Sequence, residues 1–195
     1  MKEINNVLVT GVGGQGILLA TDILADVFLA AGYDAKKSEV HGMAQRGGSV
    51  ESHVRRNKNQ VYSPLINEGE VDALVSFEPL EALRYAHMVQ PNGVIIYDTR
   101  ERPPLSVSLG QSTYPSNIPK RLEAFSRHVI PVPAAEFAAE LGNPRVSNTI
   151  LLGVLAKGMD IERDIWEQVI ERRVPEKAIS VNRDAFGKGY GVNFG

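Results

Sequence analysis

The chain has 195 residues, of which 43% are hydrophobic and 23% are charged, enough to bury one substantial core but hardly two full domains. Its net charge of −2 and its scattered lysines and arginines argue against nucleic acid as a partner. The chain contains no cysteine. It therefore cannot form a disulfide, use a thiolate nucleophile, or hold zinc or an iron–sulfur cluster through cysteine ligands of its own.

The amino-terminal residues lack the apolar core of a signal peptide. The longest apolar region, residues 17–31, is interrupted by Asp22 and Asp26 and is shorter than the roughly 20 apolar residues that span a bilayer. We therefore expect a cytoplasmic protein that does not enter a membrane. With neither repeats nor a linker, residues 1–195 are expected to form one domain.

The first predicted strand, around residues 7–9, runs into a glycine-rich turn that passes directly into a helix. This turn has the GxGxxG spacing, with glycines at Gly11, Gly13 and Gly16. Such glycines let the backbone approach a ligand closely, and the first helical turn offers unpaired N–H groups and a positive dipole end. The pattern predicts a cradle for a phosphate or another anion. A tight strand-to-helix connection without a ligand is the alternative.

The pattern continues with an amphipathic helix over residues 17–31 that packs on a sheet, then an extended piece over 33–40. A glycine-rich loop over residues 41–48 follows. It leads into a strand over 49–55 in which alternate residues form a strongly polar face.

The four histidines show no metal-ligand spacing, and no GxSxG sequence indicates a nucleophilic hydrolase. His87 and His128 are expected at surface or edge positions. His41 and His53 flank the glycine-rich loop together with Arg46, where polar residues on a rigid scaffold are often functional. A functional and a structural role both remain open for these two histidines.

A βαβ unit with a parallel strand pair is predicted from a strand over 71–77, a helix over 79–88 and a strand over 94–97. Residues 102–119 are rich in proline and serine and are expected to be irregular, with a short strand at 105–109.

The rest of the chain completes an α/β pattern and ends in a helical third. The tail over residues 187–195 is glycine-rich and is expected to be flexible or held by a partner. The predicted elements are helices over 118–125, 134–141, 146–157, 162–172 and 176–185, and a strand over 128–132.

A bound nicotinamide dinucleotide would need an acidic residue at the end of the second strand, about 20 residues beyond the glycines. Asp34 comes too early and Glu39 is borderline. This mismatch argues against a bound dinucleotide, so a free-standing NAD(P)-binding oxidoreductase is only the alternative function. A scaffold protein whose loop binds no ligand is a further alternative. An adenylyltransferase with a similar loop would usually add a set of cysteines, which this chain lacks.

Three segments carry a family resemblance: GVGGQGILLATDILADVFLAAGYDAKKSEVHGMAQRGGSVESHVRR, VYSPLINEGEVDALVSFEPLEALRYAHMVQPNGVIIYDT and ELGNPRVSNTILLG. They resemble the gamma subunit or domain of 2-oxoacid:ferredoxin oxidoreductases, and within that group most closely the beta subunit of indolepyruvate:ferredoxin oxidoreductase. The similarity extends to about Ala185, and SEVHGMAQRGGSVESHVR is its most specific part.

This resemblance implies a three-layer α/β/α sandwich with a mostly parallel, Rossmann-like sheet. It implies a subunit of a complex that decarboxylates an aryl or other 2-oxoacid on thiamine diphosphate, passes electrons through [4Fe-4S] clusters to ferredoxin and releases an acyl-CoA. The thiamine and the clusters are expected on a partner alpha subunit. The chain agrees with this in having no cysteine and no GDG-type thiamine motif.

The resemblance assigns this chain no catalytic residue, but it does imply binding residues. Those of the glycine-rich loop, where the phosphates of coenzyme A approach in related enzymes, are Gly11, Gly13, Gly14, Gln15 and Gly16.

A second matching segment, expected at the subunit interface near the thiamine site, contains Arg46, Gly47, Gly48, Ser49 and His53. Of these, Arg46 is suited to hold a phosphate or the substrate carboxylate by paired hydrogen bonds.

Asn148 matches a family asparagine near the coenzyme A and thiamine pocket, where its amide can donate and accept at once. HGMAQRGG is longer than the compact lysine–serine–glycine turn of the pyruvate enzymes. Lys36 and Lys37 therefore have two alternatives, a contact with coenzyme A or a solvated surface position. The surface position is favoured for both.

Overall fold

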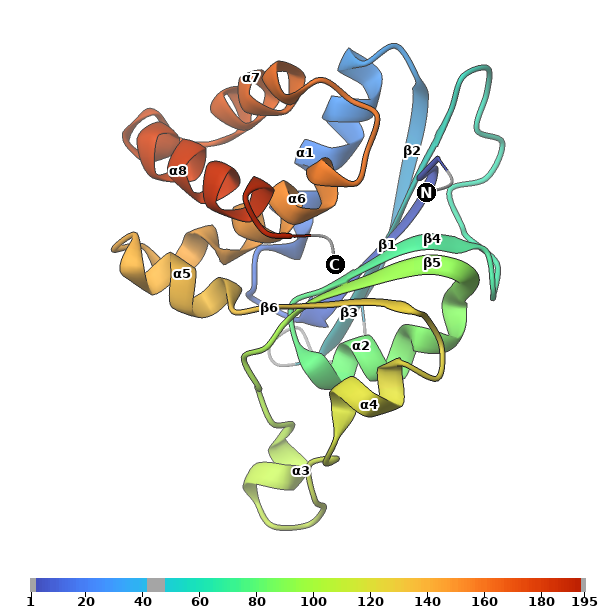
Figure 1. Ribbon diagram of the computed structural model, residues 1–195, viewed down its shortest axis with the longest axis vertical. Coiled ribbons are helices and arrows are strands. Elements are labelled where there is room, and N and C mark those ends of the chain that lie inside the picture. The colour runs from blue at the N-terminus through green and yellow to red at the C-terminus, as the bar shows by residue number, and fades with distance from the viewer. Residues whose placement is uncertain (1–2, 42–47, 194–195) are drawn as a thin grey trace.

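A computed structural model describes residues 3–41 and 48–193, and a six-stranded sheet runs through its middle (Figure 1). The strand order is β2-β3-β1-β4-β5-β6. Strands β1, β4, β5 and β6 are parallel, whereas β3 is antiparallel to both of its neighbours. The strands are β1 (Asn6–Val12), β2 (Asp34–His41), β3 (Ser49–Asn57), β4 (Val71–Ser76), β5 (Val89–Asp98) and β6 (His128–Val132).

Helices cover both faces of the sheet (Figure 1). One face carries α1 (Ile17–Ala30), α5 (Ala134–Glu140) and α6 (Ser147–Lys157), with α7 (Arg163–Arg173) and α8 (Ile179–Tyr190) packed outside them. The other face carries α2 (Pro79–Tyr85) and α4 (Ile118–Leu122), and α3 (Leu105–Ser108) lies beyond them. Short 3₁₀ turns are η1 (Ala86–Met88), η2 (Pro144–Val146) and η3 (Glu176–Ala178).

The strands alternate their side chains between two apolar cores. On β1, Val7 and Val9 belong to the larger core beneath α1 and α6, whereas Leu8 belongs to the smaller core beneath α2. All three side chains are at most 1% exposed. Buried apolar residues on both faces are typical of parallel strands covered by helices, so the predicted three-layer α/β/α sandwich is confirmed.

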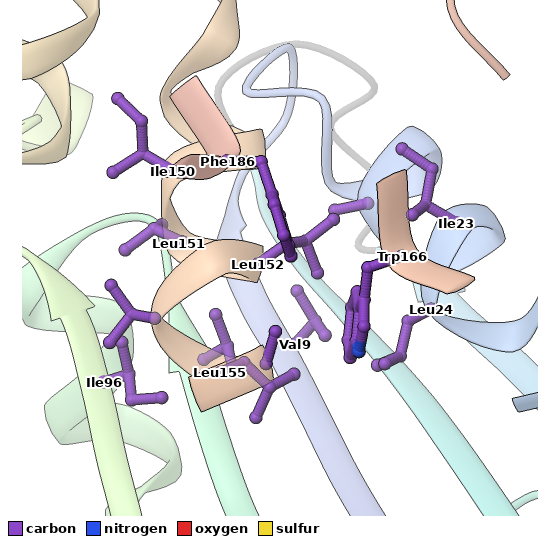
Figure 2. Close-up of a cluster of buried hydrophobic side chains, with 14 of the residues drawn as sticks. Val9, Ile23, Leu24, Ile96, Ile150, Leu151, Leu152, Leu155, Trp166 and Phe186 are labelled. Atoms are coloured by element: carbon purple, nitrogen blue, oxygen red, sulfur yellow. The ribbon is translucent and has the colours of Figure 1, made fainter. Parts of the chain in front are cut away.

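Helix α6 lies at the centre of the larger core, and all its residues from Asn148 to Ala156 are buried. Trp166 of α7 and Phe186 of α8 lie beside it with ring centroids 6.0 Å apart (Figure 2). Aromatic side chains of this size bury much apolar area, which fixes the two outer helices on α6.

The prediction of a flexible tail over residues 187–195 is wrong at its start, because residues 187–190 form the last turn of α8. A Cβ on Gly189 would lie 1.9 Å from the carbonyl oxygen of Ile150, and one on Gly153 would lie 2.3 Å from that of Phe186. The glycines therefore let α6 and α8 approach each other rather than making the chain mobile.

Two local predictions are also wrong. The strand predicted over 94–97 is longer, because β5 begins at Val89 and the expected turn at Gly93 is an irregularity within it. The short strand predicted at 105–109 is instead helix α3. The carbonyl oxygen of Pro104 accepts from the N–H groups of Val107 and Ser108, so this segment satisfies its hydrogen bonds locally.

The predicted βαβ unit is confirmed, since β4 and β5 are parallel and α2 connects them. Within the described residues, every helix is too short or too polar to cross a bilayer. The four strands that pair in parallel, β1, β4, β5 and β6, end at the same edge of the sheet. Helices α1 and α2 begin at this edge, which carries the candidate site.

Candidate functional site

The glycine-rich loop joins the end of β1 to the start of α1. Gly14 and Gly16 have φ angles of 96° and 81°, in the left-handed region that favours glycine. The N–H of Gly13 donates to the carbonyl oxygen of Gly48 at 3.0 Å, which ties the loop to the start of β3. Among the described residues, no side chain caps α1, and its first turn contains no acidic residue. Its positive end is therefore open to an anion.

Gln15 sets the shape of this loop with its side-chain amide. Its Oε1 accepts from the N–H of Val12 at 2.6 Å, and its Nε2 donates to the carbonyl oxygen of Phe77 at 2.6 Å. The amide thus bridges the ends of β1 and β4. Gln15 holds the loop in place with the same groups that would otherwise be available to a ligand.

A cavity of about 380 Å³ opens between this loop and the start of α6. The amino ends of α1 and α6 both reach it, and neither helix has an acidic residue in its first turn or a side-chain cap from residues 3–41 or 48–193. Two exposed guanidinium groups, of Arg102 and Arg145, line it as well. In the described part of the chain, no carboxylate lies within 4.0 Å of either. Two helix dipoles and two arginines make this cavity attractive to a multiply charged anion.

Asn148 lies in the first turn of α6 and contacts the glycine loop. Its Nδ2 donates to the carbonyl oxygen of Gly16 at 3.4 Å. A Cβ added to Gly16 would lie 2.9 Å from this Nδ2. Its Oδ1 accepts from the N–H of Thr149 at 2.8 Å. The hydroxyl of Thr149 in turn donates to Asn182 of α8 at 2.6 Å. Asn148 is therefore held in place at the wall of the cavity.

Of the residues that line this cavity, the sequence indicated those of the glycine loop and Asn148 but not Arg102 and Arg145. Arg145 lies in the turn η2, two residues after its N-cap Asn143. The side chain of Asn143 accepts from the N–H of Arg145 at 3.1 Å. A cation just before an apolar helix was a usable signal. Arg102 comes from the irregular segment after β5, and nothing in its local sequence shows that it approaches the glycine loop.

A second polar group lies beneath α2, next to Gly48. The hydroxyl of Ser49 donates to Oε2 of Glu81 at 2.5 Å, and the hydroxyl oxygen of Tyr85 lies 3.3 Å from that of Ser49. Burial raises the pKa of Glu81, opposed by Ser49 and Arg84, and burial likewise raises the pKa of Tyr85. Ser49 thus anchors the start of β3 to α2, and it does not line the cavity.

His53 lies away from the cavity as well. It is 5% exposed, its Nδ1 accepts from the N–H of Ile66 at 3.2 Å, and its Nε2 lies 3.9 Å from Oε1 of Glu51. Burial lowers its pKa, although Glu51 opposes the shift. The histidine holds the segment before β4 against β3.

The remaining sequence candidates are not brought to the cavity. Lys37 bonds to Asp22 and to Glu39, and these bonds outweigh burial and raise its pKa. Lys36, on the same strand, lines none of the described cavity. Arg46 and Gly47 lie outside the described residues, as does the side chain of His41. Within the described ranges, no three carboxylate or imidazole side chains are grouped as a metal site would require.

The topology separates this site from a dinucleotide-binding one. In the dinucleotide fold the second strand lies directly beside the first, and an acid at its end reaches the ribose. Here β3 lies between β1 and β2, so β2 is one strand spacing, about 4.8 Å, farther away. Asp34 lies at the opposite end of β2 and accepts from the N–H of Val61.

Comparison with known proteins identifies the family. The sequence model described as pyruvate ferredoxin/flavodoxin oxidoreductase matches residues 6–192. The chain belongs to this family.

Curated members of the oxidoreductase family are similar over long stretches. Indolepyruvate oxidoreductase subunit IorB of Pyrococcus horikoshii is 42% identical over 97% of this chain and 95% of its own length. Ketoisovalerate oxidoreductase subunit VorA of Methanothermobacter marburgensis is 31% identical over 76% of this chain, a match that covers 27% of VorA. The family resemblance drawn from the sequence is thus confirmed, and these homologues are subunits of 2-oxoacid oxidoreductases.

Two solved structures of oxoacid:ferredoxin oxidoreductases share the fold of this chain. The gamma subunit of a keto/oxoacid ferredoxin oxidoreductase from Geobacter sulfurreducens has a TM-score of 0.71 at 23% identity, over 95% of this chain and 96% of its own. The 2-oxoglutarate:ferredoxin oxidoreductase from Magnetococcus marinus, solved with 2-oxoglutarate, coenzyme A and succinyl-CoA, has a TM-score of 0.77 at 21% identity. It matches all of this chain over 32% of its own.

Proposed function

We propose that this chain is the non-redox subunit of an indolepyruvate or other aryl 2-oxoacid:ferredoxin oxidoreductase, and that it completes the active site and the coenzyme A surface. The cavity between the two uncapped helix ends, with Arg102 and Arg145 on its wall, carries the proposal. Family membership and the identity to IorB support the reaction class and the choice of oxoacid.

Coenzyme A fits the charge and the position of this cavity. Its diphosphate and 3′-phosphate are multiply charged, and arginine guanidinium groups bind phosphate oxygens in pairs. The glycine loop would hold the diphosphate on the N–H groups at the start of α1, and the second hydrogen of Asn148 Nδ2 would be available to donate to the same ligand.

The redox groups of the complex are assigned to a partner alpha subunit. With no cysteine in the chain, no iron–sulfur cluster can be held here by thiolates. Thiamine diphosphate would supply the carbanion chemistry of decarboxylation from that partner, and the clusters would carry electrons to ferredoxin. The residues of this chain would bind and orient coenzyme A beside them.

Reconstitution tests the proposal. The chain is purified alone and with its co-encoded partner, and oxoacid- and CoA-dependent reduction of a dye is measured for indolepyruvate, 2-oxoglutarate and 2-oxoisovalerate. We expect activity only in the complex, with the highest kcat/KM for indolepyruvate. Activity of the chain alone would contradict the non-redox assignment, and failure to associate with a thiamine-binding partner would contradict the proposal as a whole.

A further inference from the structure

The segment over residues 101–117, here called the arm, projects from the body of the molecule beyond α2 and α4 (Figure 1). Its two ends are fastened to one buried carboxylate. The N–H of Arg102 donates to Oε1 of Glu78 at 3.2 Å, and the hydroxyl of Tyr114 donates to the same oxygen at 2.5 Å. Glu78 is 1% exposed and also caps α2 through the N–H of Glu81. The base of the arm is therefore fixed to the start of α2.

The tip of the arm has its own hydrogen bonds. The hydroxyl of Ser112 donates to that of Ser106 at 3.0 Å, and the N–H groups of Gln111 and Ser112 donate to the carbonyl oxygen of Ser106. A segment held at its base and within its tip presents a defined surface without a large loss of entropy on binding.

The surface of the arm has the composition of a protein interface. Leu105, the first residue of α3, and Leu109, its C-cap, are 73% and 62% exposed and lie one helical turn apart. The 17 residues over 103–119 contain no charged side chain, although 23% of the chain is charged. Exposed leucines without surrounding charge are typical of the buried centre of an interface. Since residues 103–117 of the arm, beyond its base at Arg102, contain no lysine or arginine, neither nucleic acid nor an anionic lipid surface would be attracted to its tip.

The position of the arm and the lengths of the relatives indicate what binds it. Arg102, at the base of the arm, lines the cavity, so a protein on the arm would also border the proposed coenzyme A site. In VorA and in the Magnetococcus enzyme, the region similar to this chain is 27% and 32% of one longer polypeptide. Those proteins join this fold to further domains covalently. A separate subunit must achieve the same proximity through its surface.

We propose that the arm is a docking element, and that Leu105 and Leu109 insert into an apolar, uncharged groove on the partner subunit that carries the thiamine and the clusters. The inference rests on the proposed function for the identity of this partner. The insertion would place the partner near Arg102, which lines the cavity.

The test compares charged variants of the full chain in binding to the co-encoded partner. The arm variant is Leu105→Glu with Leu109→Glu, and the control is Leu29→Glu, at a leucine of α1 that is 53% exposed. Dissociation constants are measured by calorimetry, and urea unfolding checks that both variants fold. We expect the arm variant to bind at least tenfold more weakly and the control to bind within twofold of the wild type. The double variant Leu105→Met with Leu109→Met is expected to retain binding.

Three outcomes would overturn the inference. An arm variant that folds and binds the partner as tightly as the wild type would show that the arm is not at the interface. A chain that dimerises alone, and becomes monomeric in the arm variant by light scattering, would show that a second copy binds the arm. A wild-type chain that binds no thiamine-carrying partner would refute the proposed function together with the inference.

Discussion

At the scale of single residues, Gln15 connects the fold to the site. Its amide satisfies the N–H of Val12 and the carbonyl oxygen of Phe77, both partly buried, and no other side chain of the described residues bonds to these two groups. In the sequence, a glutamine within a glycine-rich strand-to-helix loop suggests a ligand contact. In the structure it first holds the loop in shape.

Replacing Gln15 with alanine should therefore lower the free energy of unfolding as well as the affinity for coenzyme A. Leaving two partly buried backbone groups without partners costs about 1–3 kcal/mol, so we expect a loss of that size in the free energy of unfolding. Urea unfolding measures it, and Gln60→Ala, at an exposed position, is the control. If Gln15→Ala weakens coenzyme A binding with unchanged stability, the amide is a ligand contact rather than part of the loop architecture.

The burial of His53 predicts how the stability of the fold depends on pH. Its Nδ1 must be unprotonated to accept from Ile66, and burial lowers its pKa in the folded state below the 6.5 of an exposed histidine. As the pH falls below 6.5, the unfolded chain therefore binds a proton before the folded one, and stability decreases until the folded pKa is passed. The stabilisation is complete only above pH 6.5.

Urea unfolding between pH 5 and pH 8 checks this. We expect the wild type to lose more stability on acidification than His53→Gln, which has an acceptor but does not titrate. His128→Gln, at an exposed position, should follow the wild type. Parallel curves for the wild type and His53→Gln would contradict the structural role of the imidazole.

At the scale of elements, the crossing of α6 and α8 depends on glycine. Gly189→Ala would place a Cβ 1.9 Å from the carbonyl oxygen of Ile150, and such overpacking costs about 1–3 kcal/mol. Gly187, two residues earlier on α8, is the matched control, because its Cβ would meet nothing closer than Nη2 of Arg163 at 3.5 Å. Alanine there should stabilise the helix by about 0.8–1 kcal/mol. Thermal unfolding of the two variants should therefore shift in opposite directions, and equal shifts would show that α8 does not pack closely on α6.

The same helix shows what the sequence could predict. Elements whose signals are local were found, such as the loop from Gly11 to Gly16 and the βαβ unit that begins at Val71. Gly187 and Gly189 were misjudged because glycine marks both mobile chain and close packing, and only the partner helix distinguishes the two. Arg102 was missed because it reaches the cavity through tertiary folding, which no periodicity in its own segment records.

At the scale of the whole molecule, the β2–β3 hairpin separates this fold from nicotinamide enzymes. The glycine loop alone would suit a dinucleotide, but β3 displaces β2 from the strand position that carries the ribose-binding acid. A ligand at 100 times its Kd stabilises a protein by about 2.7 kcal/mol, roughly 5–11 °C in melting temperature for a chain of this length. Thermal unfolding with saturating coenzyme A should show such a shift, and NADH at the same concentration should not. An equal shift with NADH would favour the free-standing oxidoreductase.

In the proposed complex, Arg102 and Arg145 would hold the phosphates of coenzyme A. Charge-assisted hydrogen bonds contribute about 1.5–3 kcal/mol each, so Arg102→Ala and Arg145→Ala should each raise the KM for coenzyme A by roughly 10- to 100-fold. The KM for the oxoacid should stay within twofold, because the decarboxylating groups are assigned to the partner. Arg121→Ala, at an exposed position on α4 away from the cavity, is the control and should change neither constant. Steady-state dye reduction by the reconstituted complex measures all of these values. A larger effect on the oxoacid than on coenzyme A would mean that the cavity binds the substrate carboxylate, and the glycine loop would then border the oxoacid instead.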